Sequence, residues 1–399
     1  MKILIHHRIA SRDGQAVHLE EMIEALRGQG HELLLVGPVA FEQTGFGSSS
    51  AAIDWIKRII PAPIYELMEI GYNLFAFRRL NKAVRQFRPD FIYERFSLFL
   101  LAGIWVHRLR RIPLLLEVNG PLFEERVRHD GLSMRTWARA CQSYIWRNVT
   151  YALPVTGVLA EQVRGYGVPK ERIAVIPNGI NPERFGSAPP TTVAKQVAGL
   201  GGRLVLGFTG FVRAWHAMDK VIEFLADEGE RLNLHLLIVG DGPSRQDLER
   251  LAESRGVSHR FTITGVVDRD AIANHVATFD VALIPGINDY ASPLKMFEYM
   301  YMGKAIVAPN QPNIREILED RRDALLFDPS DHKAMTAAIQ QLSEDGALRR
   351  QIGDQAQATI SEKKLYWSHN ASTVVELANT ALARAKAEYA DLMKAGGKA

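Results

Sequence analysis

Residues 292–295 form a predicted helix start whose groups suit an anion. In the stretch SPLKMFEYMYMG, Ser292 stands where a helix cap belongs and Pro293 at the first helical position. Backbone N–H groups at a helix start have no partner within the helix, and the helix dipole attracts negative charge there. We therefore expect Leu294 and Lys295, with the two residues before them, to bind a diphosphate. An alternative interpretation is an ordinary capped helix with a solvated lysine.

Other donor-binding candidates follow the same logic. Glu298 lies further along that helix, and because a carboxylate repels phosphate, we expect it to bind neutral hydroxyl groups such as those of a ribose. The stretch GFTGFVRAWH places a glycine turn at Gly210 and puts Arg213 and His216 where they could clamp a diphosphate. Gly240, in IVGDGP, allows either a ligand or another backbone to come close.

Two further groups of candidates lie in the first half of the chain. Gly14 and Gln15 follow the first predicted strand, and a glycine there lets an acceptor or a phosphate approach the backbone. Glu117, near the end of the predicted strand LLLEV, and Asn119, just after it, are candidate catalytic residues at the edge of its sheet. No metal ligand is predicted, because the Asp-x-Asp pair at 268–270 fits a helix cap and first turn and offers too few oxygens.

The elements that position these residues alternate between apolar strands and amphipathic helices, which is typical of parallel α/β sheets. The pattern predicts a domain over 1–185, with IAVIPNG as its last strand, and a linker over 186–202. A second domain follows over 203–363, and a helix over 364–399 is long enough to pack back on the first domain. Two doubly wound domains facing each other would place the chemistry in the cleft between them.

Composition supports a soluble protein of more than one domain, with 399 residues, 47% hydrophobic and 23% charged. The single cysteine, Cys141, favours a reducing compartment, and no signal peptide or membrane span is visible, so we expect a cytoplasmic location. Residues 54–88 mix apolar, aromatic and basic side chains. This segment either contacts the inner membrane surface or an apolar acceptor, or packs as a helix pair on the first domain. No nucleic-acid partner is expected.

Several stretches, taken in order, resemble glycosyltransferase family 4, the retaining nucleotide-sugar transferases with the GT-B fold. They include DGQAVHLEEMIEALRGQGHEL, YALPVTGVLAEQVRGYGVPKERIAVIPNGINPERF, GFTGFVRAWHAMDKVIEFL, IVGDGP and SPLKMFEYMYMGKAIVAPNQPNIREILEDRRDALLFDP. The order and spacing of the stretches, more than any one of them, make the resemblance specific.

The resemblance implies a role for individual residues. Glu298 matches the second glutamate of the family's paired-glutamate motif and would bind the donor ribose. The backbone of residues 292–295 would hold the diphosphate, and the backbone near Val267 would meet the nucleobase. Gly14 and Gln15 would lie near the donor phosphate or the acceptor.

The chain departs from the family pattern at three places. Tyr290 stands where the first glutamate of the pair belongs, with Asp289 one residue earlier, so the identity of the sugar is open. Arg213 is displaced by two positions from the family's arginine, and His216 replaces its lysine. Asn119 stands where the family often has a histidine.

The resemblance implies transfer of a sugar from a nucleoside diphosphate to a glycan, lipid-linked or small hydroxyl acceptor, with retention and without a metal or other cofactor. Arg213 and Lys295 would stabilise the charge on the leaving diphosphate. Two alternatives stay open from the residues: a nucleotide-sugar 2-epimerase of the same fold, and a non-catalytic nucleotide-sugar binding protein.

Overall fold

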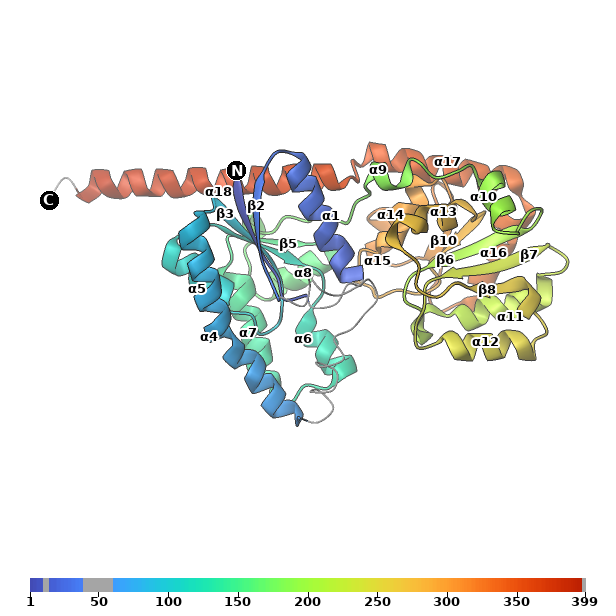
Figure 1. Cartoon of the computed structure of the whole chain (residues 1–399), viewed down its shortest axis with the longest axis horizontal. Helices are drawn as coiled ribbons and strands as arrows, with labels where there is room; N and C mark the ends of the chain where they lie inside the picture. Colours follow the sequence, from blue (N-terminus) through green and yellow to red (C-terminus); the bar gives the residue numbers. More distant parts are fainter. Residues whose placement is uncertain (10–13, 39–59, 397–399) are drawn as a thin grey trace. The chain divides into compact units, whose positions relative to one another are not determined.

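The computed structural model describes residues 1–9, 14–38 and 60–396, and these form two compact units (Figure 1). The first unit comprises Met1–Pro177 and Trp367–Ala399, and the second comprises Asn178–Tyr366. Each unit alternates strands with helices around one parallel sheet, because runs such as ILI and LLL bury side chains on both sheet faces.

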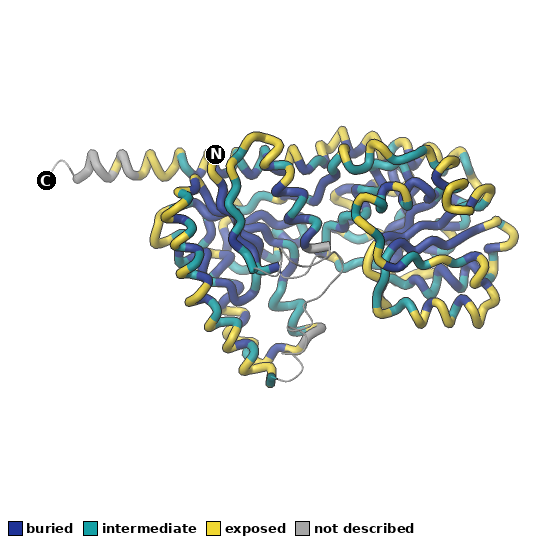
Figure 2. The backbone as a smooth tube through the Cα atoms, in the orientation of Figure 1, coloured by how far each residue is buried: buried dark blue, intermediate teal, exposed yellow. Residues whose placement is uncertain are grey.

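The first unit contains a five-stranded sheet in the order β2-β1-β3-β4-β5, with parallel pairing throughout. Its strands are β1 (Lys2–His6), β2 (Glu32–Val36), β3 (Phe91–Arg95), β4 (Leu114–Val118) and β5 (Tyr151–Pro154). Its helices are α1 (Gly14–Gly28), α4 (Ala62–Phe87), α5 (Ala102–Arg110), α6 (Leu122–Glu125), α7 (Arg135–Asn148), α8 (Gly157–Gly165) and α18 (Trp367–Gly396). The strands β1, β3, β4 and β5 are buried along most of their length, and the edge strand β2 is mainly half-buried (Figure 2).

The last helix, α18, belongs to the first unit because it packs on α1. The side-chain amide of Gln29, just after α1, donates to the Ser368 carbonyl at 2.7 Å and to Ser372 Oγ at 3.0 Å. The rings of His18 and Trp367 meet edge to face with centroids 4.8 Å apart. These contacts hold α18 against α1.

The second unit contains a six-stranded parallel sheet in the order β11-β10-β9-β6-β7-β8. Its strands are β6 (Leu204–Thr209), β7 (Leu234–Val239), β8 (Phe261–Ile263), β9 (Val281–Leu283), β10 (Ala305–Pro309) and β11 (Leu325–Phe327). Its helices are α9 (Pro182–Phe185), α10 (Thr191–Val197), α11 (Met218–Glu228), α12 (Arg245–Ser254), α13 (Ile272–Ala277), α14 (Leu294–Tyr301), α15 (Pro312–Arg315), α16 (His332–Glu344) and α17 (Gly346–Glu362). Alternate residues of β6, such as Val205 and Leu206, enter separate apolar clusters on the two sheet faces.

The division of the chain differs from the predicted boundaries. Residues 186–202, predicted as a linker, lie within the second unit and contain α10. Lys195 on α10 forms an ion pair with Asp280 at 2.7 Å, and Leu200 is buried in the second unit's core. Glycine and proline in this stretch therefore mark turns inside a packed domain.

Two other sequence expectations need revision. IAVIPNG forms no strand, since Ile173 makes only an isolated bridge to Ala152 at the sheet edge. Within the described part of 54–88, the structure has one helix, α4, in place of a helix pair; residues 54–59 lie outside the described residues. No helix among the described residues combines the length and apolar character that a bilayer crossing requires.

Candidate functional site

The carboxyl end of β6 is tied to α14 through Tyr299. The N–H of Thr209 donates to the Tyr299 hydroxyl at 2.7 Å. Burial raises the pKa of Tyr299, so the phenol stays protonated at neutral pH. The chain then turns at Gly210, whose φ of +127° lies outside the range open to ordinary side chains. A Cβ at Gly210 would lie 3.1 Å from Lys295 Nζ, so a glycine here gives the lysine room.

Gly240 serves the second of the two roles that the sequence left open. Its φ is +141°, and a Cβ there would lie 2.1 Å from the Gly210 carbonyl oxygen. The loop after β7 therefore packs directly on the backbone of the loop after β6. Gly240 thus supports the backbone at Gly210. A contact between Gly240 and a donor stays a prediction.

The start of α14 lies one residue later than the sequence suggests. Pro293 occupies the cap position with extended backbone, φ −76° and ψ 121°, and the helix begins at Leu294. Ser292 was expected to cap the helix, but it does not, because its oxygens have other donors. The N–H of Asn178 donates to Ser292 Oγ at 3.1 Å, and the Asn178 side chain donates to the Ser292 carbonyl at 2.6 Å.

This shift leaves the helix start open to an anion. Met296 donates its N–H to the Pro293 carbonyl at 3.1 Å, but the N–H groups of Leu294 and Lys295 donate to no other group in the described part of the chain. Unpartnered N–H groups at the positive end of a helix dipole are a common anion-binding arrangement.

The side chain of Lys295, the second residue of α14, packs against β6. Its Nζ is 3.6 Å from the centroid of the Phe208 ring, a cation–π contact. Burial lowers the pKa of Lys295 to about 7, while Glu298, one turn further along α14, acts to raise it. Lys295 forms no ion pair with a described residue, so a bound anion would supply its missing counter-charge.

His216 and Arg213 close the loop after β6. His216 Nδ1 accepts the N–H of Arg213 at 3.0 Å, which places the proton of the neutral ring on Nε2. Burial, aided by the charges of Lys295 and Arg213, lowers the pKa of His216 to about 3, so the ring is a neutral donor at pH 7. The exposed guanidinium of Arg213 lies over the rings of Phe211 and Trp215, at 5.1 and 4.8 Å from their centroids.

The remaining candidates in the second unit are placed as follows. Val267 is half-buried and packs against the core near β9. Where the family has its first glutamate, the side chain of Tyr290 is buried and its hydroxyl accepts a hydrogen bond from Asn288 Nδ2 at 3.1 Å. Asp289 is exposed. A tyrosine therefore occupies a packed position here, whereas the carboxylate next to it in the sequence is exposed.

In the first unit, Glu117 lies at the centre of a buried polar cluster at the end of β4. Its carboxylate accepts hydrogen bonds from the Tyr93 hydroxyl and from Arg95 Nη1, both at 2.6 Å. His18 Nδ1 lies 3.2 Å from the same carboxylate, and Asn119 Nδ2 also donates to it. Burial alone would raise the pKa of Glu117, but His18 and Arg95 bring it well below its usual range.

The structure brings Glu117 and Asn119 together but gives them different exposure. Glu117 is buried, whereas Asn119 is half-buried at the end of β4. Glu117 therefore fixes the orientation of the Asn119 amide. Gly14 and Gln15 are the first residues of α1, directly after residues 10–13, which lie outside the described residues.

Sequence reasoning missed Tyr93, Arg95 and His18. A usable signal was present for Arg95, because a charged residue ends the strand FIYER, and Glu117 lies one residue before the end of LLLEV. No local signal marks His18, which reaches Glu117 from α1, a distant part of the chain.

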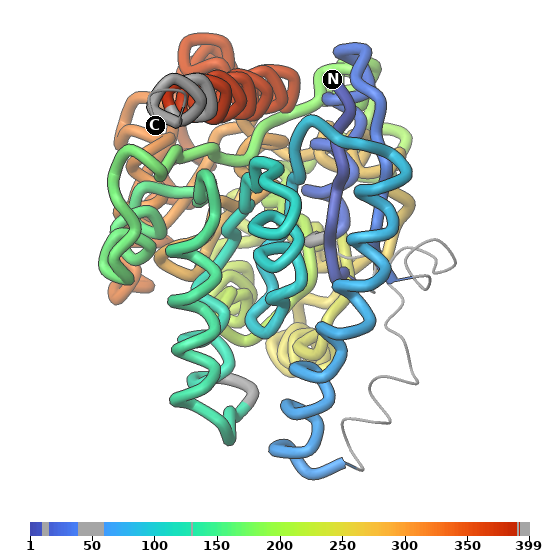
Figure 3. The backbone as a smooth tube through the Cα atoms, turned by 90° about the vertical axis from the view of Figure 1, so that its left-hand side faces the viewer, coloured from blue at the N-terminus to red at the C-terminus, as the bar shows by residue number. Residues whose placement is uncertain are grey.

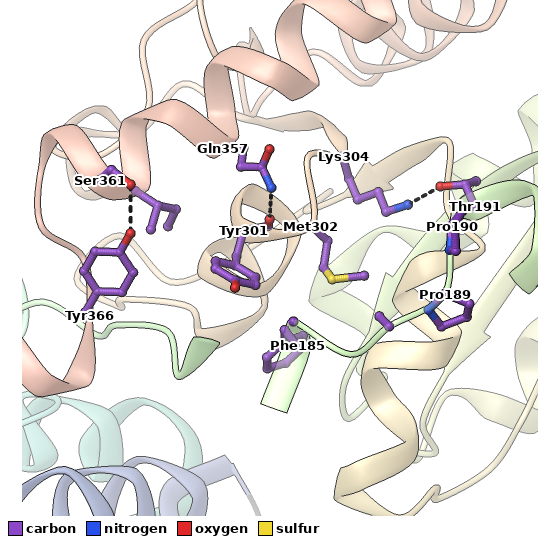
Figure 4. A pocket seen from close by; sticks show the side chains of 13 residues that line it. Phe185, Pro189, Pro190, Thr191, Tyr301, Met302, Lys304, Gln357, Ser361 and Tyr366 are labelled. Carbon is purple, nitrogen blue, oxygen red and sulfur yellow. Dashed lines mark hydrogen bonds between the residues drawn. The ribbon is translucent and has the colours of Figure 1, made fainter. Parts of the chain in front are cut away.

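A separate hollow of about 480 Å³ lies at the amino end of β10 (Figure 4). Lys304 lines it and donates to Thr191 Oγ1 at 2.9 Å and to the carbonyl of Ala277, the last residue of α13, at 2.8 Å. Burial lowers the pKa of Lys304 to about 8. Because this lysine satisfies the end of a helix, it has a structural role, and none of the predicted site residues lines the hollow.

Comparison with known proteins identifies the family. A model of glycosyltransferase family 4 matches residues 12–184, and a model of the glycosyl transferases group 1 matches residues 202–345. The chain belongs to glycosyltransferase family 4. These two matches correspond to the two units, so each unit carries its own family signature.

The relatives of this family 4 chain are named as transferases. It is 28% identical over 317 residues to the lipopolysaccharide core biosynthesis glycosyltransferase LpsD of Rhizobium meliloti, covering 75% of this chain and 79% of LpsD. It is 27% identical over 159 residues to alpha-D-kanosaminyltransferase of Streptomyces kanamyceticus, covering 40% of this chain and 41% of that relative. The match thus spans less than half the length of the latter protein.

The structure of HepE from Anabaena in complex with UDP superimposes with a TM-score of 0.75 at 18% identity, covering 95% of this chain and all of HepE. At this identity the likeness shows the fold, an α/β GT-B fold of two domains. Neither the epimerase nor the non-catalytic alternative is favoured by these comparisons.

Proposed function

We propose that this protein transfers a sugar from a nucleoside-diphosphate sugar to a hydroxyl acceptor, with retention of configuration, in the synthesis of a glycan, polysaccharide or glycolipid. Family membership supports this proposal, as does the naming of LpsD for lipopolysaccharide core biosynthesis. A nucleotide-sugar donor is supported by the neighbour HepE, whose structures contain UDP and UDP-glucose.

The observation that carries the proposal is the start of α14. The N–H groups of Leu294 and Lys295 have no acceptor among the described residues, and the Lys295 side chain has no ion-pair partner there. Breaking a glycosidic bond to a diphosphate leaves negative charge on the departing phosphate. Donors already fixed where that charge develops lower the barrier without having to reorganise, and this is often the largest catalytic contribution.

Each nearby residue has a role in this proposal. Lys295 and Arg213 stabilise the charge of the leaving diphosphate, and His216 donates through Nε2. Gly210 leaves space for the phosphate and for Lys295. Glu298 accepts hydrogen bonds from the ribose hydroxyls, because a carboxylate would repel the phosphates.

The backbone near Val267 meets the nucleobase in this proposal. In the first unit, Asn119, held by Glu117, would orient a hydroxyl of the sugar or acceptor, and Gly14 and Gln15 would approach the donor phosphate or the acceptor. A cytoplasmic location is proposed with it, supported by the single cysteine in 399 residues.

Thermal unfolding in the presence of UDP, GDP, ADP and their sugars tests the proposal first. A ligand that binds only the folded state raises the melting temperature. We expect one nucleotide to do so, and we expect Lys295→Ala to remove most of that rise. If no nucleotide changes the melting temperature, the proposed donor site is wrong.

Two measurements then test the finer features. NMR of the product at early times shows whether the anomeric configuration of the donor is retained. Transfer measured after dialysis against a chelator, with and without added Mg²⁺ or Mn²⁺, tests independence of metals. Conversion of the donor to an epimer without acceptor would support the epimerase alternative instead.

A further inference from the structure

We propose that the outer face of α4 in the first unit is a docking surface for a membrane that contains anionic lipids. Its apolar part, called the α4 stripe, consists of Ile64, Leu67, Met68, Leu74 and Phe75, each between 51% and 60% exposed. These residues recur at intervals of three, four and seven, so they lie along one side of the helix. Soluble proteins seldom expose a continuous apolar strip of this kind without a partner for it.

The inward face of α4 buries Ala76, Leu80 and Val84, but its amino-terminal half also buries two polar residues, Glu66 and Asn73. Glu66 is only 1% exposed, and its carboxylate accepts the N–H groups of Ser133 and Met134 at 2.8 and 2.7 Å. These N–H groups immediately precede α7, so Glu66 supplies the acceptors for the start of that helix.

Asn73 does the same for a second neighbour. Its Oδ1 accepts the N–H of Leu101 at 2.6 Å and of Ala102 at 3.1 Å, at the start of α5. Its Nδ2 donates to the Phe99 carbonyl at 2.6 Å. Rotating α4 to bury the stripe would leave two helix starts without acceptors, so the buried polar residues hold the apolar side outward.

Basic residues continue the stripe toward the carboxyl end of α4. Arg78, Lys82 and Arg85 are exposed at spacings of four and three, and they form no ion pair within the described residues. The two acidic residues of α4 are both engaged: Glu66 as above, and Glu69 with Arg8 at 3.3 Å and Arg126 at 2.8 Å. The exposed side of α4 therefore carries positive charge only.

The neighbouring helices α5 and α7 lack acidic residues, and α7 exposes an apolar and a basic side chain. Figure 3 shows α4, α5 and α7 side by side on one face of the first unit. Near the start of α7, Trp137 is 65% exposed and Arg139 is also exposed. Exposed tryptophan and leucine together with arginine and lysine are typical of surfaces that lie in the headgroup region of a bilayer.

Charge favours lipid over a second copy as the occupant. Two copies docked face to face would bring the arginines and lysines of both α4 helices close together, where they repel. An anionic bilayer can bind both groups of residues. The α4 stripe would lie at the boundary of the acyl chains, and the basic residues would contact lipid phosphates.

Vesicle flotation with the full chain tests this inference, using phosphatidylcholine vesicles with or without phosphatidylglycerol. We expect flotation only with phosphatidylglycerol, weakened at high salt. The triple variant Arg78→Gln, Lys82→Gln, Arg85→Gln should bind roughly 100-fold more weakly, since each basic residue near an anionic surface contributes about fivefold. The double variant Leu74→Glu, Phe75→Glu should lose at least about tenfold, from lost apolar contact.

The matched control is Val193→Glu, Val197→Glu, which places two carboxylates on exposed apolar positions of α10 in the second unit. It should float like the parent protein. Melting temperatures and nucleotide binding should be unchanged in all variants, because the altered side chains are exposed and lie outside the donor site. The nucleotide-binding measurement would thus reveal a failure of the proposed donor site independently of the flotation result.

Three outcomes would overturn the inference. The first is no flotation with phosphatidylglycerol at low salt, and the second is equal loss of flotation in the α10 control. The third is a stable dimer in sedimentation that Leu74→Glu, Phe75→Glu dissociates, which would make the stripe a contact between copies.

Discussion

The carboxyl ends of the two parallel sheets use charged residues in opposite ways. In the first unit, the carboxylate of Glu117 is buried and receives hydrogen bonds from Tyr93, Arg95 and Asn119. In the second unit, Lys295 and Arg213 form no ion pair with a described residue. The carboxyl end of the first unit's sheet, here called the first edge, has its buried carboxylate paired within the protein. The carboxyl end of the second unit's sheet, the second edge, has cations without counter-charges among the described residues.

This difference indicates a structural role for the first edge and a ligand-binding role for the second. A buried network of hydrogen bonds around one carboxylate fixes side-chain positions and makes a rigid support. Lys295 has no counter-charge and is desolvated by burial in the ligand-free protein, and a bound anion recovers that cost. We therefore expect substitutions at the first edge to change stability, and substitutions at the second edge to change binding and turnover.

The largest expected effect is from Glu117→Ala. It removes the buried carboxylate and leaves Arg95 without its counter-charge, so the free energy of unfolding should fall by about 3–5 kcal/mol. Urea denaturation measures this change. The control is Glu161→Ala, which breaks an exposed ion pair with Arg164 and should cost at most about 1 kcal/mol. Equal effects of the two substitutions would show that the first edge is not a rigid support.

The next effect is from Arg213→Ala at the second edge. The guanidinium is exposed, so the melting temperature should stay the same. Turnover should fall on the order of 100-fold, because a fixed donor to the leaving group is lost, and donor affinity should fall less. Steady-state kinetics separate the two, with Lys333→Ala, an exposed cation on α16, as the control. Unchanged turnover would remove Arg213 from the mechanism.

Glu298→Ala should act mainly on affinity. Losing charged hydrogen bonds to ribose hydroxyls should weaken nucleotide binding about 10-fold or more. Calorimetry with the nucleotide identified by thermal unfolding measures this, and Glu298→Gln should retain part of the affinity. An unchanged dissociation constant in the alanine variant would end the ribose assignment.

The sequence predicts the first of these edges less well than the second. Local patterns were enough for the strands that form and for the helix start near Leu294, since apolar runs and a Ser-Pro turn are short-range signals, but they also predicted a strand at IAVIPNG that does not form. The cap at Ser292 was wrong by one residue because Asn178, far away in the sequence, donates to it. The cluster around Glu117 depends on His18 from α1, and the buried polar residues of α4 depend on backbone N–H groups at 101 and 133–134. Such long-range pairings leave no periodic pattern.

The smallest expected effect is a pH dependence of donor affinity. Burial lowers the pKa of Lys295 to about 7 in the ligand-free protein, and a bound diphosphate should raise it. The complex then binds more protons than the free protein above pH 7, so affinity falls as pH rises. With a free pKa near 7, binding should be about fivefold weaker at pH 8 than at pH 7. An intact nucleotide-sugar is the proper ligand, because its diphosphate diester does not titrate in this range.

Calorimetry in two buffers of different ionisation enthalpy detects the proton taken up. Lys295→Arg is the matched control, since arginine keeps its charge throughout this range and should give a nearly flat profile. His216 does not contribute, because its pKa of about 3 keeps it neutral across these conditions. If the parent protein were as flat as the arginine variant, Lys295 would already be charged without ligand. The second edge would then resemble the first, with its charge satisfied inside the protein.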